Sequence, residues 1–207
     1  MSQYVEMSKK AVIYLLFFGV LLAGFYIAMI KLTDFEKVKL PVLNTVQPFQ
    51  FLRQDSNMIS QKDIGNRIYV AEYFFTTCKG ICPKMNKNMK AIYEKYKSNP
   101  DFLILSHTVN PETDSLPVLK RYADSLGANA GNWWFLTGSK KDLYKSARES
   151  YLLDDPKNSS KNIEDQFLHT QFFALVDRQG RVRGIYDGIK KDEVENLLHD
   201  IEELIKE

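Results

Sequence analysis

Two cysteines, Cys78 and Cys82, are the residues of this 207-residue chain whose type and spacing best suit chemistry. They are its only cysteines, and three residues separate them in the stretch FFTTCKGICPKM. A disulfide between such close positions closes a short loop and removes little entropy from the unfolded chain. A thiolate, in contrast, is both a nucleophile and a metal ligand. The pair therefore indicates a redox or metal-binding role rather than structural cross-linking.

The sequence predicts that these cysteines lie at the start of a helix. Pro83 suits the first turn of a helix, where its missing N–H costs nothing. Apolar residues then recur at helical spacing along 84–98. The helix dipole and the free N–H groups of a first turn favour a thiolate and lower the cysteine pKa. We expect Cys82 at this N-terminus and Cys78 in the preceding loop, so that both sulfurs can face one point.

One of three histidines is a candidate third ligand. His107 lies within the apolar run 101–109 and is expected to be a hydrogen-bonded core residue, whereas His199 belongs to the C-terminal helical pattern and should be partly exposed. His169 stands where the polar segment 151–166 gives way to the apolar run TQFFALVD. A loop histidine is more often a surface residue than a ligand. The cysteine loop in a similar position at the sheet margin makes His169 a candidate.

Two thiolates and one imidazole suit copper, since thiolate selects Cu(I) and imidazole binds both oxidation states. Zinc is the alternative, but a structural zinc site needs four protein ligands, and no fourth is apparent in the sequence. Met85 and Met89 share the apolar face of the predicted helix. We therefore expect them in the core rather than on copper.

The elements that position these residues form an alternating pattern. Buried strands are predicted at 67–75, 101–109 and 132–138, helices at 84–98, 115–127, 139–150 and 191–207, and hairpins at 49–58 and 170–188. Such alternation predicts an α/β fold with a mixed central sheet flanked by helices. The cysteines fall between a central strand and the next helix, where sheets of this kind hold ligands.

The N-terminal segment 11–30 contains 20 residues and no charge. As a helix it is about 30 Å long, the thickness of a bilayer core. A cleaved signal peptide is the alternative, but the apolar run is longer than usual and lacks a small-x-small cleavage site. We expect a short N-terminus at 1–10, a transmembrane anchor at 11–30, a tether at 31–45 and one globular domain at 46–207.

Charge supports an anchored, exported domain. Lys9 and Lys10 precede the apolar segment, so the positive-inside rule places 1–10 in the cytoplasm and the domain outside. Ten residues leave no room for an Arg-rich transit peptide, which favours a bacterial inner membrane over an organelle. The net charge of +2 belongs entirely to residues 1–31. The balanced remainder offers no basic face, so nucleic acid is not an expected partner.

The cysteine loop and three further segments together resemble the Sco/SenC family, thioredoxin-fold copper-binding assembly factors of cytochrome c oxidase. The segments that carry the resemblance, in family order, are FFTTCKGICP, VNPETD, WWFLTG and LHTQFFALVDRQG. Three positions depart from the family pattern. Asn110 replaces an aspartate, Thr77 stands where many members have histidine, and Leu168 stands where many have aspartate.

The resemblance implies a thioredoxin-like fold in which Cys78, Cys82 and His169 bind copper. It further implies a periplasmic role in delivering copper to the dinuclear site of oxidase subunit II, or in reducing the cysteines of that site. Other copper chaperones or thiol reductants would then be partners. The alternatives are a membrane-anchored thiol–disulfide oxidoreductase acting on exported cysteines, and a peroxiredoxin-like or structural domain. The sequence leaves open whether the chain is an enzyme.

Overall fold

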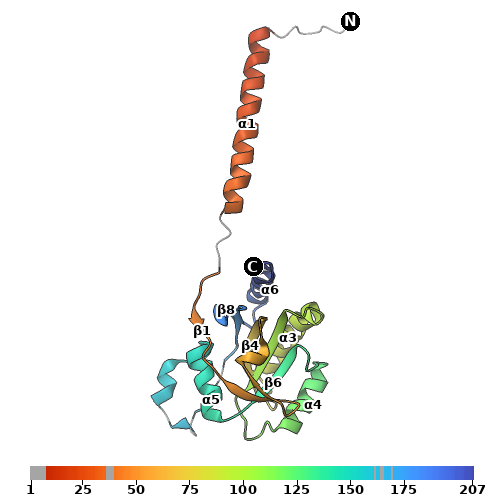
Figure 1. Cartoon of the computed structure of the whole chain (residues 1–207), viewed down its shortest axis with the longest axis vertical. Helices are drawn as coiled ribbons and strands as arrows, with labels where there is room; N and C mark the ends of the chain where they lie inside the picture. Colours follow the sequence, from red (N-terminus) through yellow and green to blue (C-terminus); the bar gives the residue numbers. More distant parts are fainter. Residues whose placement is uncertain (1–7, 36–39, 161, 164–165, 169) are drawn as a thin grey trace. The chain divides into compact units, whose positions relative to one another are not determined.

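The chain divides into two compact units, Met1–Lys39 and Leu40–Glu207. A computed structural model describes residues 8–35, 40–160, 162–163, 166–168 and 170–207. In the first unit, α1 (Lys9–Phe35) contains the predicted apolar segment (Figure 1). Its part Lys9–Met29 is long and apolar enough to cross a membrane by length and composition, and none of it is buried within the protein. This helix is therefore a candidate membrane anchor.

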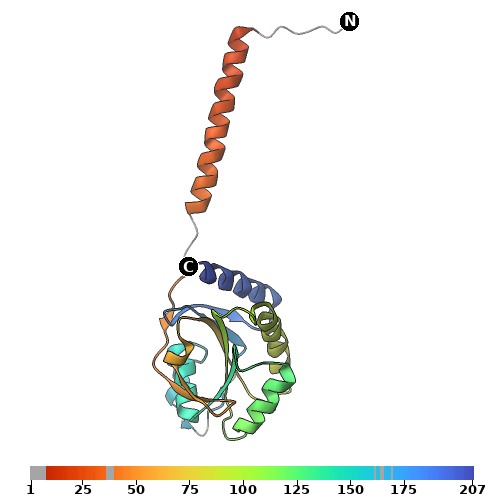
Figure 2. The same ribbon diagram turned by 45° about the vertical axis from the view of Figure 1, so that its right-hand side comes forward.

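The second unit is built on one mixed sheet of eight strands, in the order β1-β8-β7-β4-β5-β6-β2-β3. The strands are β1 (Asn44–Thr45), β2 (Gln50–Arg53), β3 (Met58–Ser60), β4 (Ile68–Phe74), β5 (Phe102–Thr108), β6 (Trp133–Thr137), β7 (Phe172–Val176) and β8 (Arg181–Asp187). The central strands β4, β5 and β6 are parallel, and all other pairings are antiparallel. Figure 2 shows the sheet as a curled layer with helices packed against it. The predicted α/β fold with a mixed sheet is confirmed.

The predicted helices are present, with two changes of boundary. The helices of this unit are α2 (Gln61–Ile64), α3 (Cys82–Tyr96), α4 (Leu116–Leu126), α5 (Lys140–Lys145) and α6 (Lys191–Lys206). Helix α3 begins at Cys82 itself, with Pro83 in its first turn. The helix predicted at 139–150 is α5 followed by a π-helical turn, Ser146–Ser150. The predicted loop 151–166 contains a 3-10 turn, Pro156–Ser160.

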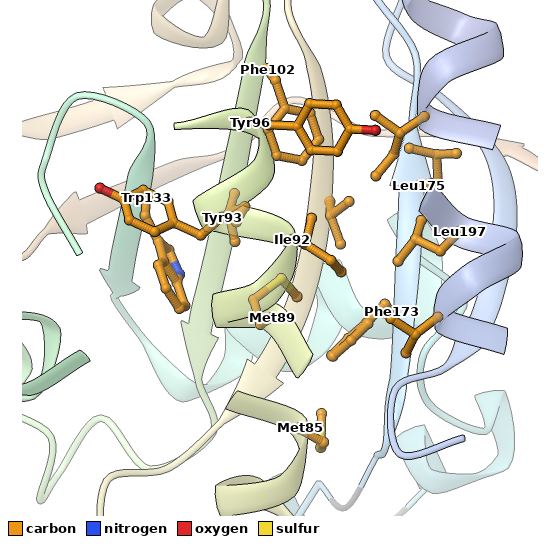
Figure 3. Close-up of a cluster of buried hydrophobic side chains, with 14 of the residues drawn as sticks. Met85, Met89, Ile92, Tyr93, Tyr96, Phe102, Trp133, Phe173, Leu175 and Leu197 are labelled. Atoms are coloured by element: carbon orange, nitrogen blue, oxygen red, sulfur yellow. The ribbon is translucent and has the colours of Figure 1, made fainter. Parts of the chain in front are cut away.

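Strand alternation divides the buried side chains between two cores. Every residue of β4 is buried, and successive side chains point to opposite faces of the sheet. One core lies under α3, α4 and α6, and Figure 3 shows Met85 and Met89 of α3 within it. The expectation that these methionines are core residues is confirmed. The second core packs α5 against the other face. Pairing with β5 extends along all of β4, including the end that leads into the cysteine loop.

Candidate metal centre

The cysteine loop connects the end of β4 to the start of α3 and contains both thiols in free form. Cys78 is half-buried in the loop, and Cys82 is buried in the first turn of the helix. The two side chains hydrogen bond to one another, and the Cys78 sulfur also accepts bonds from backbone N–H groups of Gly80, Ile81 and Cys82. The expected convergence of the two sulfurs is therefore present in the structure.

The two thiols have different acidities. Burial raises the pKa of Cys78, but the hydrogen bonds from Cys82 and from the loop amides outweigh burial, so the net pKa lies below the ordinary value. Burial, together with the hydrogen bond to Cys78, raises the pKa of Cys82 to about 12. The sequence-based expectation that the helix N-terminus would favour a Cys82 thiolate is wrong in direction. The loop amides are aimed at Cys78 instead, and Cys82 lies in apolar surroundings.

A pocket of about 320 Å³ opens beside the two cysteines. Its lining comes from the cysteine loop, from Val109 after β5, and from Leu168 and Thr170 before β7. Leu168 is 3% exposed and Thr170 is 8% exposed. Because β7 is antiparallel to β4, the start of β7 lies near the end of β4 that leads into the cysteine loop. Topology thus brings the segment before β7 to the cysteines.

His169, the predicted third ligand, lies outside the described residues. Its two sequence neighbours, Leu168 and Thr170, both line the cysteine pocket. One residue farther back, the Phe167 ring contacts the Phe75 ring of the cysteine loop, with centroids 5.2 Å apart. Within the described parts of the chain, no group of three His, Cys, Asp or Glu side chains is placed to hold a metal.

The other two histidines have the environments expected from the sequence. His107 is fully buried in β5, and its Nδ1 lies 3.3 Å from the carbonyl oxygen of Glu72. His199 lies on α6 with 71% of its side chain exposed. Neither lines the pocket beside the cysteines.

Asp114 links the cysteine loop to the end of β5. Its buried carboxylate accepts hydrogen bonds from the backbone N–H and hydroxyl of Thr76 and from the hydroxyl of Thr108. The backbone N–H of Asn110 donates to the Thr108 hydroxyl oxygen, and its carbonyl accepts from the Asp114 N–H. The bonds of Asn110 here are made by its backbone, so they do not require the aspartate typical of the family at this position. In the sequence, Asp114 stood out only as the last residue of the VNPETD segment.

Glu72 is a buried acid that the sequence reasoning missed. It lies in β4, where the Ser106 hydroxyl donates to its Oε1 at 2.6 Å and the Trp133 indole donates in turn to Ser106. Burial raises the pKa of Glu72 to about 7, against the lowering effect of the Ser106 bond. Its charge also contributes to the raised pKa of Cys82. The available signal was a lone charged residue inside the apolar run RIYVAEYFF.

Comparisons with known proteins agree with this arrangement. A family model described as SCO1/SenC matches residues 39–206. The SCO1 protein homolog of Bacillus subtilis (strain 168) is 31% identical over 170 residues, which cover 80% of this chain and 86% of that protein. The structure of BsSco, described as a Sco-family cytochrome c oxidase assembly protein with a disulfide switch, has a TM-score of 0.67 at 30% identity and covers 80% of this chain and 96% of its own.

A more distant structure, copper-bound ScoI of Arabidopsis thaliana, has a TM-score of 0.61 at 22% identity and covers 78% of this chain and 98% of its own. At this identity the likeness concerns the fold. The thioredoxin-like α/β fold implied by the sequence resemblance is confirmed by these neighbours.

Proposed function

Because this chain belongs to the SCO1/SenC family, we propose that it is a membrane-anchored copper metallochaperone whose ligands are Cys78, Cys82 and His169. The observation that carries the proposal is the cysteine pocket. Two free thiols meet in it, and both sequence neighbours of His169 line it. Two thiolates and one imidazole form a donor set that holds both Cu(I) and Cu(II). Copper bound to the Arabidopsis relative supports the choice of metal.

The two thiols have different roles in loading the metal. Metal ligation requires thiolates, so each cysteine must release a proton. Cys78, with its lowered pKa and partial exposure, is the thiol that ionises more readily and receives the ion. The raised pKa of Cys82 keeps this thiol protonated until ligation. The proton then leaves, because a thiol that coordinates a metal is deprotonated outright. An acceptor protein would approach from the Cys78 side, since Cys82 is buried.

The proposed acceptor is the dinuclear copper site in subunit II of cytochrome c oxidase. The related BsSco belongs to a family of oxidase assembly proteins. Helix α1 would hold the chain in a bacterial inner membrane, with Leu40–Glu207 on the periplasmic side and residues 1–10 in the cytoplasm. A membrane-tethered chaperone is confined to the same surface as a membrane-embedded oxidase, which raises their encounter frequency.

A thiol–disulfide oxidoreductase is the second candidate, and the unequal acidity of the two cysteines favours it. A half-exposed thiol with a lowered pKa is suited to attack a disulfide, and a buried neighbour is suited to resolve the mixed disulfide. This activity would use the same sulfurs but would not need His169. The histidine therefore separates the two functions.

The deciding experiment is His169→Ala in the full-length chain in detergent. If His169 is a ligand, Cu(II) binding should weaken and the thiolate-to-copper absorption should change markedly, because Cu(II) prefers nitrogen donors. Cu(I) binding should weaken without vanishing, since two thiolates remain. The rate of reaction with a small disulfide should stay near the wild-type rate.

His199→Ala is the matched control, because it removes an exposed histidine from α6 and leaves the pocket intact. It should reproduce the wild-type copper spectrum. A His169→Ala protein with an unchanged copper spectrum and a collapsed thiol-exchange rate would overturn the proposal in favour of the oxidoreductase.

A further inference from the structure

Tyr144 joins the segment before His169 to the end of β5. Tyr144 lies in α5 and is fully buried. Its hydroxyl oxygen accepts a hydrogen bond from the backbone N–H of Leu168 at 3.2 Å. The same hydroxyl donates to the carbonyl oxygen of Val109 at 2.9 Å. One phenol group therefore connects the peptide immediately before His169 to the end of β5.

Val109 extends this connection to the cysteine loop. Its backbone N–H donates to the carbonyl oxygen of Phe74 at 2.8 Å. Phe74 is the last residue of β4, four residues before Cys78. A continuous series of hydrogen bonds thus runs from Leu168 through Tyr144 and Val109 to the strand that leads into the cysteines. It joins the two segments that the proposed copper site needs together.

Arg148 fastens the same loop farther from the site. Its guanidinium lies 2.6 Å from the Asp154 carboxylate and donates to the side-chain oxygen of Gln166. The Asn158 amide donates to the other oxygen of Asp154 at 2.7 Å. These contacts attach both ends of segment 154–166 to the π-helical turn that contains Arg148. The Tyr144 bond to Leu168 is closer to β7 than any of these contacts.

We propose that Tyr144 is a positioning residue for the copper site, which sets the backbone before His169 in register with the cysteine loop. This inference rests on the proposed function, because it requires His169 to be a ligand. A ligand on a polar loop must otherwise be ordered when the metal binds, and this ordering lowers affinity. The phenol holds the Leu168 backbone, immediately before His169, before metal arrives. Groups that orient metal ligands in this way commonly change metal affinity by roughly 10- to 100-fold when they are removed.

The test is Tyr144→Phe in the full-length chain in detergent, measured with Cu(II) alone and with Cu(I) alone. Loss of the hydroxyl should weaken Cu(II) binding by roughly 10- to 100-fold and shift the thiolate-to-copper absorption. Cu(I) affinity should change much less, because it depends mainly on the two sulfurs. Reaction with a small disulfide should keep the wild-type rate.

Tyr96→Phe is the matched control. Tyr96 also donates its hydroxyl to a backbone carbonyl, that of Leu198 at 3.3 Å, but it does so between α3 and α6, away from the pocket. This variant should retain wild-type copper spectra. Equal copper losses in Tyr96→Phe and Tyr144→Phe would overturn the inference, as would wild-type Cu(II) affinity in Tyr144→Phe.

A double variant separates this inference from the proposed function. If Tyr144 acts through His169, adding Tyr144→Phe to His169→Ala should cause no further loss of Cu(II) affinity. A His169-dependent copper spectrum with additive losses would overturn the positioning role while leaving the metallochaperone intact. A copper spectrum that does not depend on His169 would overturn both.

Hydrogen exchange of the Leu168 amide tests the bond in the wild-type chain, whether or not the variant folds. Protection of this amide well above that of an unstructured loop supports the inference. Exchange at the rate of an unstructured amide would overturn it.

Discussion

Cys78 and Cys82 occupy one loop, yet their surroundings give the two thiols opposite acid–base behaviour. Backbone amides of Gly80 and Ile81 point at the Cys78 sulfur, whereas Cys82 is 4% exposed and packs in the core under α3. Sequence alone identified the pair and the helix start. It could not show which sulfur the loop amides contact, because the direction of these amides depends on the backbone conformation of the loop between β4 and α3 rather than on residue type.

The first residue-scale prediction concerns alkylation of the reduced chain. Cys78 has the lowered pKa and the greater exposure, so iodoacetamide at neutral pH should modify it well before Cys82. Peptide mapping by mass spectrometry after partial reaction measures the order. Cys82→Ser should retain a reactive thiol, whereas Cys78→Ser should leave a slow one. Faster labelling of Cys82 than of Cys78 would contradict the assignment.

A second residue-scale prediction is that oxidation abolishes copper binding. The two side chains already hydrogen bond, so an exported chain should form the Cys78–Cys82 disulfide readily. A disulfide has no thiolate to offer, so the oxidised chain should bind little copper until a reductant restores it. Thiol titration and copper content, measured before and after oxidation, test this. Undiminished copper in fully oxidised protein would refute it.

At the scale of elements, β4 is a buried central strand that contains an ionisable residue, Glu72. The strand was predicted from its apolar run, and all of its residues are buried. Glu72 could not be assigned from the run, because a single acid in a strand can equally face solvent at an edge. The carboxyl group is buried because β4 lies between β5 and β7 in the centre of a sheet that has a core on each face.

Glu72 predicts a specific pH dependence of stability. Its pKa is about 7 in the folded chain and near 4.5 unfolded, so the folded state binds more protons between these values. Stability should therefore fall as pH rises from about 4.5 to 7, by about 3 kcal/mol from this group. Glu72→Gln should remove that loss. Urea unfolding of both chains at pH 5 and pH 8 measures it.

His107 contributes a slope of the opposite sign. Burial lowers its pKa to about 4, so its stabilising effect is lost as pH falls below its unfolded value of 6.5. The histidine is present in both chains, so the difference between wild type and Glu72→Gln isolates the carboxyl group. The hydrogen bond from Lys97 lowers the pKa of Glu94, an exposed residue on α3, so this group is ionised in both folded and unfolded chain above pH 5. Glu94→Gln should therefore leave the wild-type difference between pH 5 and pH 8 unchanged. An identical pH dependence in wild type and Glu72→Gln would refute the assignment.

The helix predicted at 139–150 shows where local sequence patterns are insufficient. Helical periodicity indicated one helix, but the chain forms α5 and then a π-helical turn. The Asn44 side chain, more than a hundred residues away, donates to the carbonyl oxygens of Glu149 and Ser150 at this turn. Long-range bonds of this kind contact the end of the helix, and no window of neighbouring residues contains them. For the same reason, the roles of Tyr144 and Arg148 could not be predicted, because their hydrogen-bond partners lie outside this helix and turn.

At the scale of the whole molecule, the division into an apolar helix and one α/β unit was readable from composition. A charge-free stretch of 20 residues suits a lipid bilayer, whereas the remainder, with equal numbers of acidic and basic residues and a regular hydrophobic pattern, suits water. The central strands and helices followed from periodicity, and the topological position of the cysteines followed from their order. The contact between the cysteine loop and the segment before β7 could not be derived from the order of the elements, because it depends on the antiparallel pairing of β7 with β4.

The last prediction concerns α1, which should remain in the mature protein as a single membrane span. The helix contains a charge-free run from Ala11 to Ile30. The mature chain should therefore resist extraction from membranes by alkaline carbonate, and its N-terminus should map before Ala11. Leu21→Arg places a charge near the middle of the span, which costs about 3 kcal/mol for insertion, and should shift chain into the soluble fraction. Leu21→Phe keeps the span apolar and serves as the control. A mature N-terminus beyond Ile30 would show that the segment is a removed signal peptide, and the copper centre would then act as a freely diffusing domain.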